Sequence, residues 1–331
     1  MSDGGVGRPS RATEPATGAK IAYIISAYRL PELLVRLVEN LDGPGTCTLI
    51  HVDAKAPDYV FRYMTKALAA RSRVTFLPRH PCHWGDFGHV RATLKGLSEL
   101  ISSGQEFDYV VLLTGQDYPL RSNEDLARTL GQANGQVFMR PMPIPNEEWT
   151  NGGNYRFENW HFRLAGRTFS FPGLPLRRGW LRAAWSRAAR SLHLQRSFPV
   201  GLEPWGGSSY WMIPADCARY IDRYARSHPS FVKFFHHVRV PDEIFFHTIV
   251  MNSPFRSLIA SSDLRYIDWT GGGDSPKVLT TGDIPRLMDS GALFARKFDP
   301  SVDAEVLDRI DRIRAGERYS PQTEPGAKEL S

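Results

Sequence analysis

The sequence predicts an α/β fold, in which a mostly parallel, Rossmann-like sheet is flanked by helices on both faces within a single domain. Apolar segments of strand length alternate with amphipathic helical segments over residues 21–115, and such alternation is typical of parallel sheets. The chain has 331 residues, of which 42% are hydrophobic, so it can bury the core of one large domain. Its cysteines, Cys47, Cys82 and Cys217, are odd in number and unclustered, which indicates neither a disulfide framework nor a zinc site.

The first strand is predicted at residues 21–28, where the sequence IAYIISAY is almost continuously apolar. The segment PELLVRLVENL at 31–41 spaces its apolar residues at helical intervals. It also begins with Pro31, a residue favoured at the first helical position. CTLIHVD at 47–53 has the pattern of a second buried strand.

The alternation continues through the next sixty residues. Residues 59–70 are helical in pattern, and RSRVTFLP at 71–78 is predicted as the third strand. A long amphipathic helix is expected at 87–103, followed by the apolar strand YVVLLTG at 109–115. Together these segments form a βαβαβαβ unit, which favours a doubly wound sheet.

The predicted site lies beyond the carboxyl ends of these strands, where ligands of doubly wound sheets bind. The loops there are polar, around Ala27, at 51–55 and at 114–118. The chain has neither a GxGxxG motif after the first strand nor a GxxxxGK[ST] motif. A phosphorylated ligand would therefore meet a metal or Lys and Arg side chains. Each candidate loop, IHVDAK and GQDYP, offers one acid, which is too few for a hard divalent cation.

The ends of the chain are predicted to be flexible tails. Residues 1–18 and 315–331 are rich in Gly, Pro, Ser, Thr and charge, which leaves the domain at 19–314. Regular alternation stops between about 140 and 205, and we expect this insertion to face the acceptor. No apolar run is long enough to cross a membrane. The net charge of +6 does not by itself select a partner.

Six motifs along the chain carry a resemblance to a known family. They are IHVDAKAP (50–57), HWGDFGHVRATL (83–94), LLTGQDYPLRS (112–122), GGSSYWMI (206–213), VPDEIFFHTIVMNSPF (240–255) and LFARKFD (293–299). With these motifs in this order, the chain resembles the core-2/I-branching β-1,6-N-acetylglucosaminyltransferases, a family that includes the peptide O-xylosyltransferases. The resemblance implies a GT-A-type fold, inverting transfer of a sugar from a UDP donor and, as in the branching enzymes, no metal.

Two adjacent carboxylates, Asp242 and Glu243, stand between apolar residues in VPDEIFF. A buried carboxylate must be paired, hydrogen-bonded or protonated. The resemblance implies that Glu243 is the general base that deprotonates the acceptor hydroxyl, with Asp242 beside the donor sugar or acceptor. The alternative is that both acids begin a helix over 242–251, where negative charge is favourable.

The resemblance also implies that Lys297, in LFARKFD, binds the donor diphosphate in place of a metal. Lys277 is the best match to a second, upstream cation, and Arg296 is a competing candidate. The alternative for this pair of cations is a solvated basic surface with Asp299 as partner.

For the nucleotide, the resemblance assigns Asp53 a position near the base or ribose. Ala27, Tyr28 and Arg29 end the first strand and should line the same pocket. His51 is expected to be a hydrogen-bonded structural residue.

The remaining candidates would contact the donor sugar or the acceptor. Asp117 is equally consistent with a turn residue before Pro119, and Trp84 with a buried tryptophan. Trp160 is a further acceptor candidate. The full set is Trp84, Gln116, Asp117, Glu148, Trp149, Tyr155, Arg156, Trp205, Ser208, Ser209 and Asp242.

Residues 176–196 contain six arginines and no acid, with apolar residues at helical spacing. Such a helix contacts a membrane or an anionic acceptor, or it docks on the core with its arginines in solvent. Neither alternative is excluded by the sequence.

We therefore expect a metal-independent, inverting glycosyltransferase without a cofactor, which uses UDP-GlcNAc as first choice and UDP-xylose as second. Its acceptor would be a glycan, glycoconjugate or small molecule. The alternative is a sugar-nucleotide-binding or glycan-binding protein without turnover. No nucleic-acid-binding module is recognisable. The animal members of the family have a membrane anchor and many disulfides, and this sequence shows neither feature. We therefore expect a bacterial, cytoplasmic enzyme, with peripheral membrane contact through 176–196 as an option.

Overall fold

The computed structural model describes residues 18–164, 166–172, 185, 187–188, 191–192, 194–272 and 275–317. Nearly all of the two predicted tails, and most of the predicted helix at 176–196, lie outside these described residues. No helix among the described residues is long and apolar enough to span a membrane.

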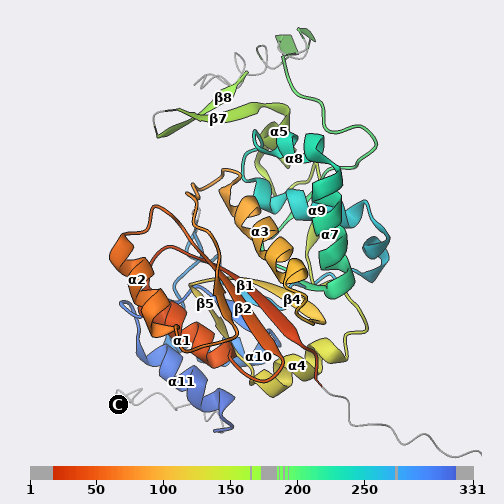
Figure 1. The fold of residues 1–331 in the computed structure, drawn as a ribbon. Helices are drawn as coiled ribbons and strands as arrows, with labels where there is room; N and C mark the ends of the chain where they lie inside the picture. Colours follow the sequence, from red (N-terminus) through yellow and green to blue (C-terminus); the bar gives the residue numbers. More distant parts are fainter. Residues whose placement is uncertain are drawn as a thin grey trace, which may run out of the picture.

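The central sheet has five strands in the order β10-β4-β1-β2-β3 (Figure 1). Four strands are parallel, and β10 pairs antiparallel with β4 at one edge. The predicted mostly parallel α/β sheet is therefore confirmed. The strands are β1 (Ile21–Ala27), β2 (Thr46–Val52), β3 (Val74–Phe76), β4 (Tyr109–Thr114) and β10 (Met212–Pro214).

Helices cover both faces of this sheet, because alternate side chains of a strand point to opposite faces. Tyr23 and Ile25 of β1 pack in one apolar cluster, whereas Ala22 and Ile24 pack in the other. The first cluster contains α1 (Pro31–Leu41), α2 (Asp58–Ala67), α4 (Asn123–Gly131), α10 (Ile284–Asp289) and α11 (Glu305–Arg314). The second contains α3 (Gly88–Ser102), α7 (Ala215–Ser227), α8 (Pro229–Phe235) and α9 (Phe245–Met251).

A small second sheet follows directly from the end of β4. It has the order β11-β12-β5 and contains β5 (Asp117–Pro119), β11 (Arg265–Ile267) and β12 (Phe294–Arg296). In its register Arg296 is opposite Asp117. This sheet therefore brings the C-terminal motif beside the carboxyl end of β4.

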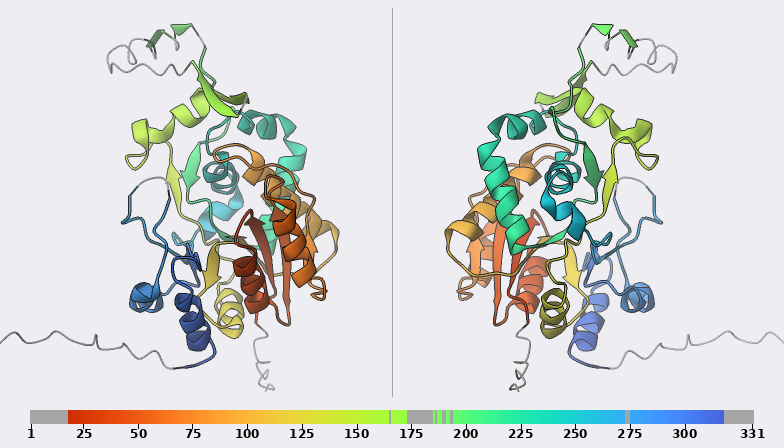
Figure 2. Two further views of the ribbon diagram at one scale, coloured as in Figure 1. Left: turned by 90° about the vertical axis from the view of Figure 1, so that its left-hand side faces the viewer. Right: turned by 90° about the vertical axis from the view of Figure 1, so that its right-hand side faces the viewer.

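The predicted insertion forms its own small elements on the side of α3 and α9 (Figure 2). They are β6 (Pro141–Pro143), η1 (Thr150–Gly153), α5 (Tyr155–Glu158), β7 (Trp160–Leu164), β8 (Arg167–Phe171) and β9 (Trp205–Gly207). The pairing of β9 with β6 needs glycine, because a Cβ at Gly207 would lie 2.1 Å from the Arg140 carbonyl oxygen and 2.5 Å from His247 Nε2.

The helix predicted over 242–251 is divided in the structure. A 3₁₀ turn, η2 (Pro241–Glu243), is separated from α9 by Ile244, whose φ of −124° is not helical. Val240 enters the turn with φ at +50°, a region that β-branched residues rarely adopt. Asp242 and Glu243 therefore belong to a separate turn rather than to the α-helix, which corrects the alternative drawn from the sequence. The other short turns are η3 (Pro254–Leu258) and η4 (Thr281–Asp283).

Candidate active site

The predicted site residues gather at the carboxyl edge of the central sheet. The Asp53 backbone N–H donates to the Ala27 carbonyl at 2.8 Å, which joins the ends of β1 and β2. Arg29, just after β1, reaches Asp299, just after β12, at 3.2 Å. Loops from distant parts of the chain therefore meet at one edge, as ligand sites of such sheets require.

Glu243 is held by a cation from the insertion. Arg156 Nη1 donates to Glu243 Oε2 at 2.5 Å, and the Arg156 guanidinium stacks on the Trp149 ring at 3.6 Å. The Glu243 side chain keeps 30% of its surface exposed. Burial raises the pKa of Glu243 above its ordinary value and Asp242 adds to the rise, while Arg156 opposes it. The result is a carboxylate with solvent access and elevated basicity.

The neighbouring carboxylate and the segment 205–210 form the next part of the site. The Ser209 hydroxyl donates to Asp242 Oδ2 at 2.8 Å, and the Ser208 hydroxyl accepts from the Tyr210 N–H at 3.4 Å. Trp205 is half-buried and donates its backbone N–H to Thr248 of α9. The structure thus brings Asp242, Glu243, Arg156, Trp149 and the 205–210 segment together.

Trp84 is 58% exposed rather than buried. The Arg239 guanidinium lies over its ring at 4.9 Å, and the adjacent Gly85 carbonyl accepts from the Val240 N–H at 3.0 Å. Arg239 also donates its backbone N–H to the Arg156 carbonyl at 2.8 Å. Trp84 therefore flanks the same turn as Glu243, where an exposed ring can stack on a ligand.

Three cations converge on the other side of the site. Burial lowers the pKa of Lys297, and so do Arg29 and Arg296 nearby, while Asp299 raises it. Lys297 Nζ donates to the Ser275 hydroxyl. Like charges that lower the pKa of Lys297 in this way are electrostatically unfavourable until an anion binds.

Tyr210 connects the cations to the Glu243 side. The guanidiniums of Arg296 and Arg265 lie over its ring at 4.4 and 4.7 Å. Ser209 binds Asp242 of the turn η2, and the next residue, Tyr210, contacts Arg296. The segment 208–210 therefore lies next to both the turn and the cations. The molecule therefore places the turn that carries Asp242 and Glu243 close to a cationic cluster.

Three predicted residues have structural partners instead. Asp117 is fully buried and accepts from Arg265 Nη1 at 2.9 Å and from the Thr114 N–H at 2.6 Å. Gln116 is buried and donates to the Phe298 carbonyl at 3.2 Å. Lys277 Nζ is paired with Asp283 at 2.7 Å. These contacts favour the turn alternative for Asp117 and make Lys277 a weaker diphosphate candidate than Arg29.

The proposed nucleotide end has a buried carboxylate and exposed neighbours. Asp53 Oδ1 accepts from the N–H groups of Lys55 at 2.8 Å and Cys82 at 3.2 Å. Tyr28 is exposed and Ala27 is buried. Glu148 is exposed, Tyr155 is half-buried, and the Tyr155 carbonyl bonds to the ring of His161 at 3.0 Å.

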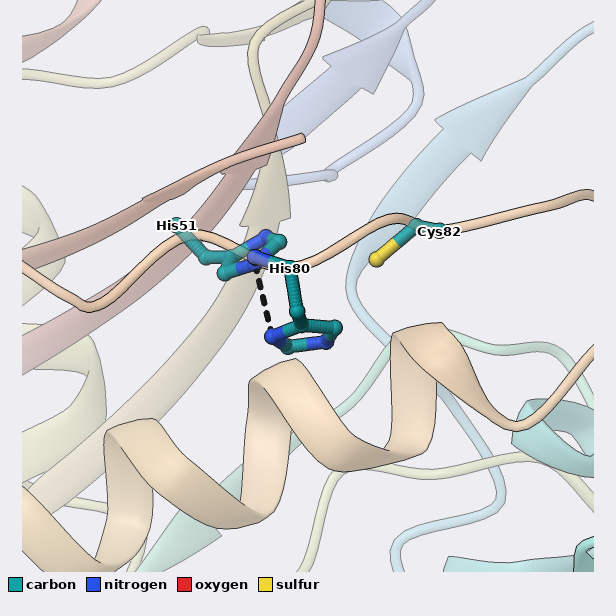
Figure 3. Close-up of side chains that lie close together, drawn as sticks. All are labelled: His51, His80 and Cys82. Carbon is teal, nitrogen blue, oxygen red and sulfur yellow. Dashed lines mark hydrogen bonds between the residues drawn. The ribbon is translucent and has the colours of Figure 1, made fainter. Parts of the chain in front are cut away.

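His51 belongs to a buried cluster with His80 and Cys82, whose ligand atoms all lie within 4.8 Å of one another (Figure 3). His51 Nε2 and His80 Nδ1 share a hydrogen bond at 3.0 Å. Burial lowers the pKa of His51 to about 4 and raises that of Cys82 to about 12. The cluster could hold a borderline or soft cation. His80 Nε2 also bonds to the Gly88 carbonyl at 2.9 Å, so hydrogen bonds hold both rings in place, as expected for a structural histidine.

Sequence reasoning missed several residues of the site: Arg265, Tyr210, Arg239, Asp299 as the partner of Arg29, and Ser275. One sequence feature could have indicated Arg265, which is a charged residue between Leu264 and Tyr266 at the start of the short strand β11. Tyr210 and Asp299 lie inside two of the six motifs, but their contacts with Arg296 and Arg29 involve residues distant in the chain.

Comparison with known proteins decides the family. The sequence model described as "Branch: Core-2/I-Branching enzyme" matches residues 21–288. The chain belongs to the core-2/I-branching enzyme family. Membership of this family confirms the resemblance that the sequence motifs indicated.

Curated relatives of this core-2/I-branching chain include xylosyltransferases. Rat xylosyltransferase 2 is 26% identical over 337 residues, covering 95% of this chain and 36% of the relative. Human xylosyltransferase 2 is 26% identical over 348 residues, covering 98% and 37%. Xylosyltransferase oxt of Drosophila pseudoobscura pseudoobscura is 23% identical, covering 91% and 34%. The chain thus spans about a third of the length of these relatives.

Two solved structures are also similar, with low TM-scores. Core-mannan synthase A (CmsA/Ktr4) from Aspergillus fumigatus, in its Mn/GDP form, has a TM-score of 0.35 and 12% identity, covering 76% of this chain and 74% of that chain. The mannosyltransferase Ktr4p from S. cerevisiae, in complex with GDP, has a TM-score of 0.34 and 13% identity, covering 80% and 72%.

The buried pair of Asp117 and Arg265 gives a stability prediction. Asp117→Ala leaves the Arg265 guanidinium buried without its counter-ion, so we expect the free energy of unfolding to fall by about 3–5 kcal/mol. Urea-induced unfolding followed by circular dichroism measures the change. Glu39→Ala, which removes only an exposed pair with Arg71, should cost less than about 1 kcal/mol. Normal stability with weakened donor binding would instead place Asp117 at the donor sugar.

Proposed function

We propose that this chain is an inverting glycosyltransferase that moves a sugar from a UDP-sugar to an acceptor hydroxyl. One observation carries the proposal: Ser209 binds Asp242, the neighbour of the partly exposed Glu243 with its raised pKa, and the adjacent Tyr210 lies under Arg296, which belongs to the cationic group with Lys297 and Arg29. A transferase of this kind needs a base and an anion site in that relation.

The chemistry follows from the two groups. The acceptor oxygen attacks the anomeric carbon as the bond from that carbon to the diphosphate oxygen breaks. Glu243 takes the hydroxyl proton as general base, and UDP leaves with the negative charge. One carboxylate suffices for inversion, whereas retention through a covalent intermediate needs a second carboxylate as nucleophile.

The cationic cluster would stabilise the leaving diphosphate. Lys297, Arg29 and Arg296 are fixed positive charges, and such charges are most effective where negative charge develops. Asp53, with Tyr28 beside it, would receive the nucleotide. Trp84, Trp149 and Trp205 have half-buried or exposed side chains and would contact the sugar or acceptor.

The proposal includes independence from a metal at the diphosphate. Within the described ranges, the grouping with three potential ligands is His51, His80 and Cys82, which contains no carboxylate. Mg²⁺ and Mn²⁺ prefer carboxylate and other oxygen ligands, so this cluster is not suited to them. The cations of the site supply the positive charge instead.

The donor sugar has two candidates. Similarity to xylosyltransferases supports UDP-xylose as the donor. The resemblance to the β-1,6-N-acetylglucosaminyltransferases of the family supports UDP-GlcNAc. A screen of both donors for transfer or slow hydrolysis separates them.

Glu243→Gln tests the base. The amide cannot take up the acceptor proton, so we expect kcat to fall by about 10²–10⁴-fold, while UDP binding measured by calorimetry stays within a factor of about two, since the diphosphate cations are unchanged. The control Glu305→Gln changes an exposed acid that pairs with Arg309 and should keep full activity. Undiminished turnover in Glu243→Gln removes this residue from the mechanism. A wild-type chain that binds UDP-sugars but turns none over would be a binding protein.

Arg156→Gln tests the electrostatics of the base. Glu243 must be ionised to act, so kcat/KM should decline as the pH falls through its raised pKa. Arg156 lowers that pKa, so its removal raises the pKa further, and the acidic limb of the profile should move to higher pH. The control is Arg163→Gln, whose partner is Asp86 and which should leave the limb in place. A limb that moves to lower pH contradicts the assignment.

Removal of divalent cations tests the diphosphate site. Because the cationic side chains balance the leaving group, EDTA should leave turnover unchanged, and Lys297→Ala should lower kcat by about 10²–10³-fold. Lys277→Ala should have a smaller effect on kcat, since its ammonium is tied to Asp283. Activity lost in EDTA and restored by Mn²⁺ would overturn metal independence.

A further inference from the structure

Two histidines and a cysteine meet where the end of β2 lies against the loop that leads into α3. His51 is in β2, and His80 and Cys82 are in the loop between β3 and α3. One nitrogen of each ring and the Cys82 sulfur all lie within 4.8 Å of one another. His51 and Cys82 are buried, and Figure 3 shows the sulfur directed toward the two rings. Three potential ligand atoms therefore face one small space.

The hydrogen bonds of His80 determine which of its nitrogens can bind a cation. Its Nε2 lies 2.9 Å from the Gly88 carbonyl oxygen. Because a carbonyl can only accept, this nitrogen carries the proton, and Nδ1 of the neutral ring has a lone pair. Histidines that bind metals usually donate their other ring nitrogen to a carbonyl or carboxylate in this way. His80 therefore has the tautomer and the support of a metal ligand.

The contacts of His51 Nε2 exclude each other in neutral rings. The His80 backbone N–H donates to this nitrogen at 3.2 Å, which requires a lone pair on it. A hydrogen bond to His80 Nδ1, 3.0 Å away, would require a proton on the same atom. One nitrogen of a neutral imidazole cannot both donate and accept. If both nitrogens present lone pairs they repel each other, and a cation bound by both removes that repulsion.

The ligand types select the kind of ion. Imidazole nitrogen and thiolate sulfur are ligands of Zn²⁺, at about 2.0–2.1 Å and about 2.3 Å. Tetrahedral geometry with these bond lengths separates the ligand atoms by about 3.3–3.6 Å. The two nitrogens, at 3.0 Å, are close to that spacing. The sulfur has at most about 1.3 Å to move, since it lies within 4.8 Å of both.

The loop that supplies two of the ligands is already fixed to the end of β2. The Cys82 N–H donates to Asp53 Oδ1 at 3.2 Å, and the His80 carbonyl accepts from the Ala54 N–H at 3.1 Å. Gly88, at the start of α3, approaches so closely that a Cβ there would lie 2.8 Å from the Cys82 Cα atom. Little conformational entropy is therefore lost when these side chains bind an ion.

We propose that His51, His80 and Cys82 bind one Zn²⁺ ion, which joins the end of β2 to the loop before α3. Cys82 binds as the thiolate, and its proton passes to solvent. Water takes the fourth position of the tetrahedron. The role of the ion is structural and does not depend on the proposed transfer reaction. A requirement of that reaction for Mn²⁺ would concern another site, because Mn²⁺ prefers oxygen ligands.

Metal analysis of the full chain, purified without a histidine tag, tests the proposal. After dialysis with Zn²⁺ and then against metal-free buffer, we expect one Zn²⁺ per chain by mass spectrometry. Zn²⁺ should raise the melting temperature, since the ion binds the folded chain. Co²⁺ in its place should give the visible bands of a tetrahedral ion and a thiolate-to-cobalt charge-transfer band. Failure to retain Zn²⁺, an unchanged melting temperature, or bound Co²⁺ without the thiolate band would each overturn the proposal.

Ligand variants locate the ion. Cys82→Ala and His80→Gln should each lower the Zn²⁺ affinity measured by calorimetry by more than about 100-fold, because loss of an outer partner alone costs about 10–100-fold. His80 is only half-buried, so His80→Gln should fold even where Cys82→Ala does not, and circular dichroism checks both.

The matched controls keep the cluster intact. Cys217→Ala removes another buried free cysteine, and His228→Gln removes an exposed histidine. Both should bind Zn²⁺ as the wild-type chain does. Unchanged affinity in a folded ligand variant, or an equal loss in the controls, contradicts the assignment of these ligands.

Discussion

The buried pair of Asp117 and Arg265 is the interaction on which the geometry of the site depends. It lies where the central sheet meets the small sheet, and Arg265 also donates to the Leu112 carbonyl of β4 at 2.8 Å. Asp117 Oδ2 also accepts from the Thr114 N–H at 2.6 Å, so the pair is bound to the end of β4, while Asp117 Oδ1 and Arg265 Nε have no hydrogen-bond partner. The pair also positions Arg296, which is opposite Asp117 on β12. It positions Tyr210 as well, because the guanidiniums of Arg265 and Arg296 both lie over the Tyr210 ring. The cations of the site are thus placed by a rigid support rather than by a flexible loop.

Glu243 is positioned by a second, separate set of contacts. Trp149 carries the guanidinium of Arg156, and Trp149 itself is packed so closely against Gly153 and Gly206 that a Cβ at either glycine would fall within 2.5 Å of its ring. Arg156 is therefore held before it meets Glu243, and little conformational entropy is lost in forming the ion pair. The insertion, which has no regular alternation in sequence, thereby contributes Arg156, the group that lowers the pKa of Glu243.

The sequence allowed the sheet, the flanking helices and the edge of the site to be predicted, because each of these depends on local apolar periodicity. Glu243 and Lys297 came from the resemblance of short motifs. Periodicity could not predict the break at Ile244, where three apolar residues in succession are compatible with a continuous helix. It could not pair Asp117 with Arg265, 148 residues away, since nothing local distinguishes a turn aspartate from a buried partner. The pairing of Lys277 with Asp283 would have been easier to predict, because the two residues are only six positions apart in the sequence.

The arrangement of like charges around Lys297 bears on how an anion would be bound. Burial and the neighbouring Arg29 and Arg296 all disfavour the protonated amine, so the free site carries an electrostatic cost that Asp299 offsets only in part. A diphosphate would remove that cost and restore the ordinary protonation of the lysine, so the repulsion present before binding contributes to selectivity for a multiply charged anion. When the glycosidic bond breaks, additional charge develops on the same oxygens. The cluster would then interact more strongly with the departing UDP than with the intact donor, which is the condition for a group to lower a barrier rather than merely to bind.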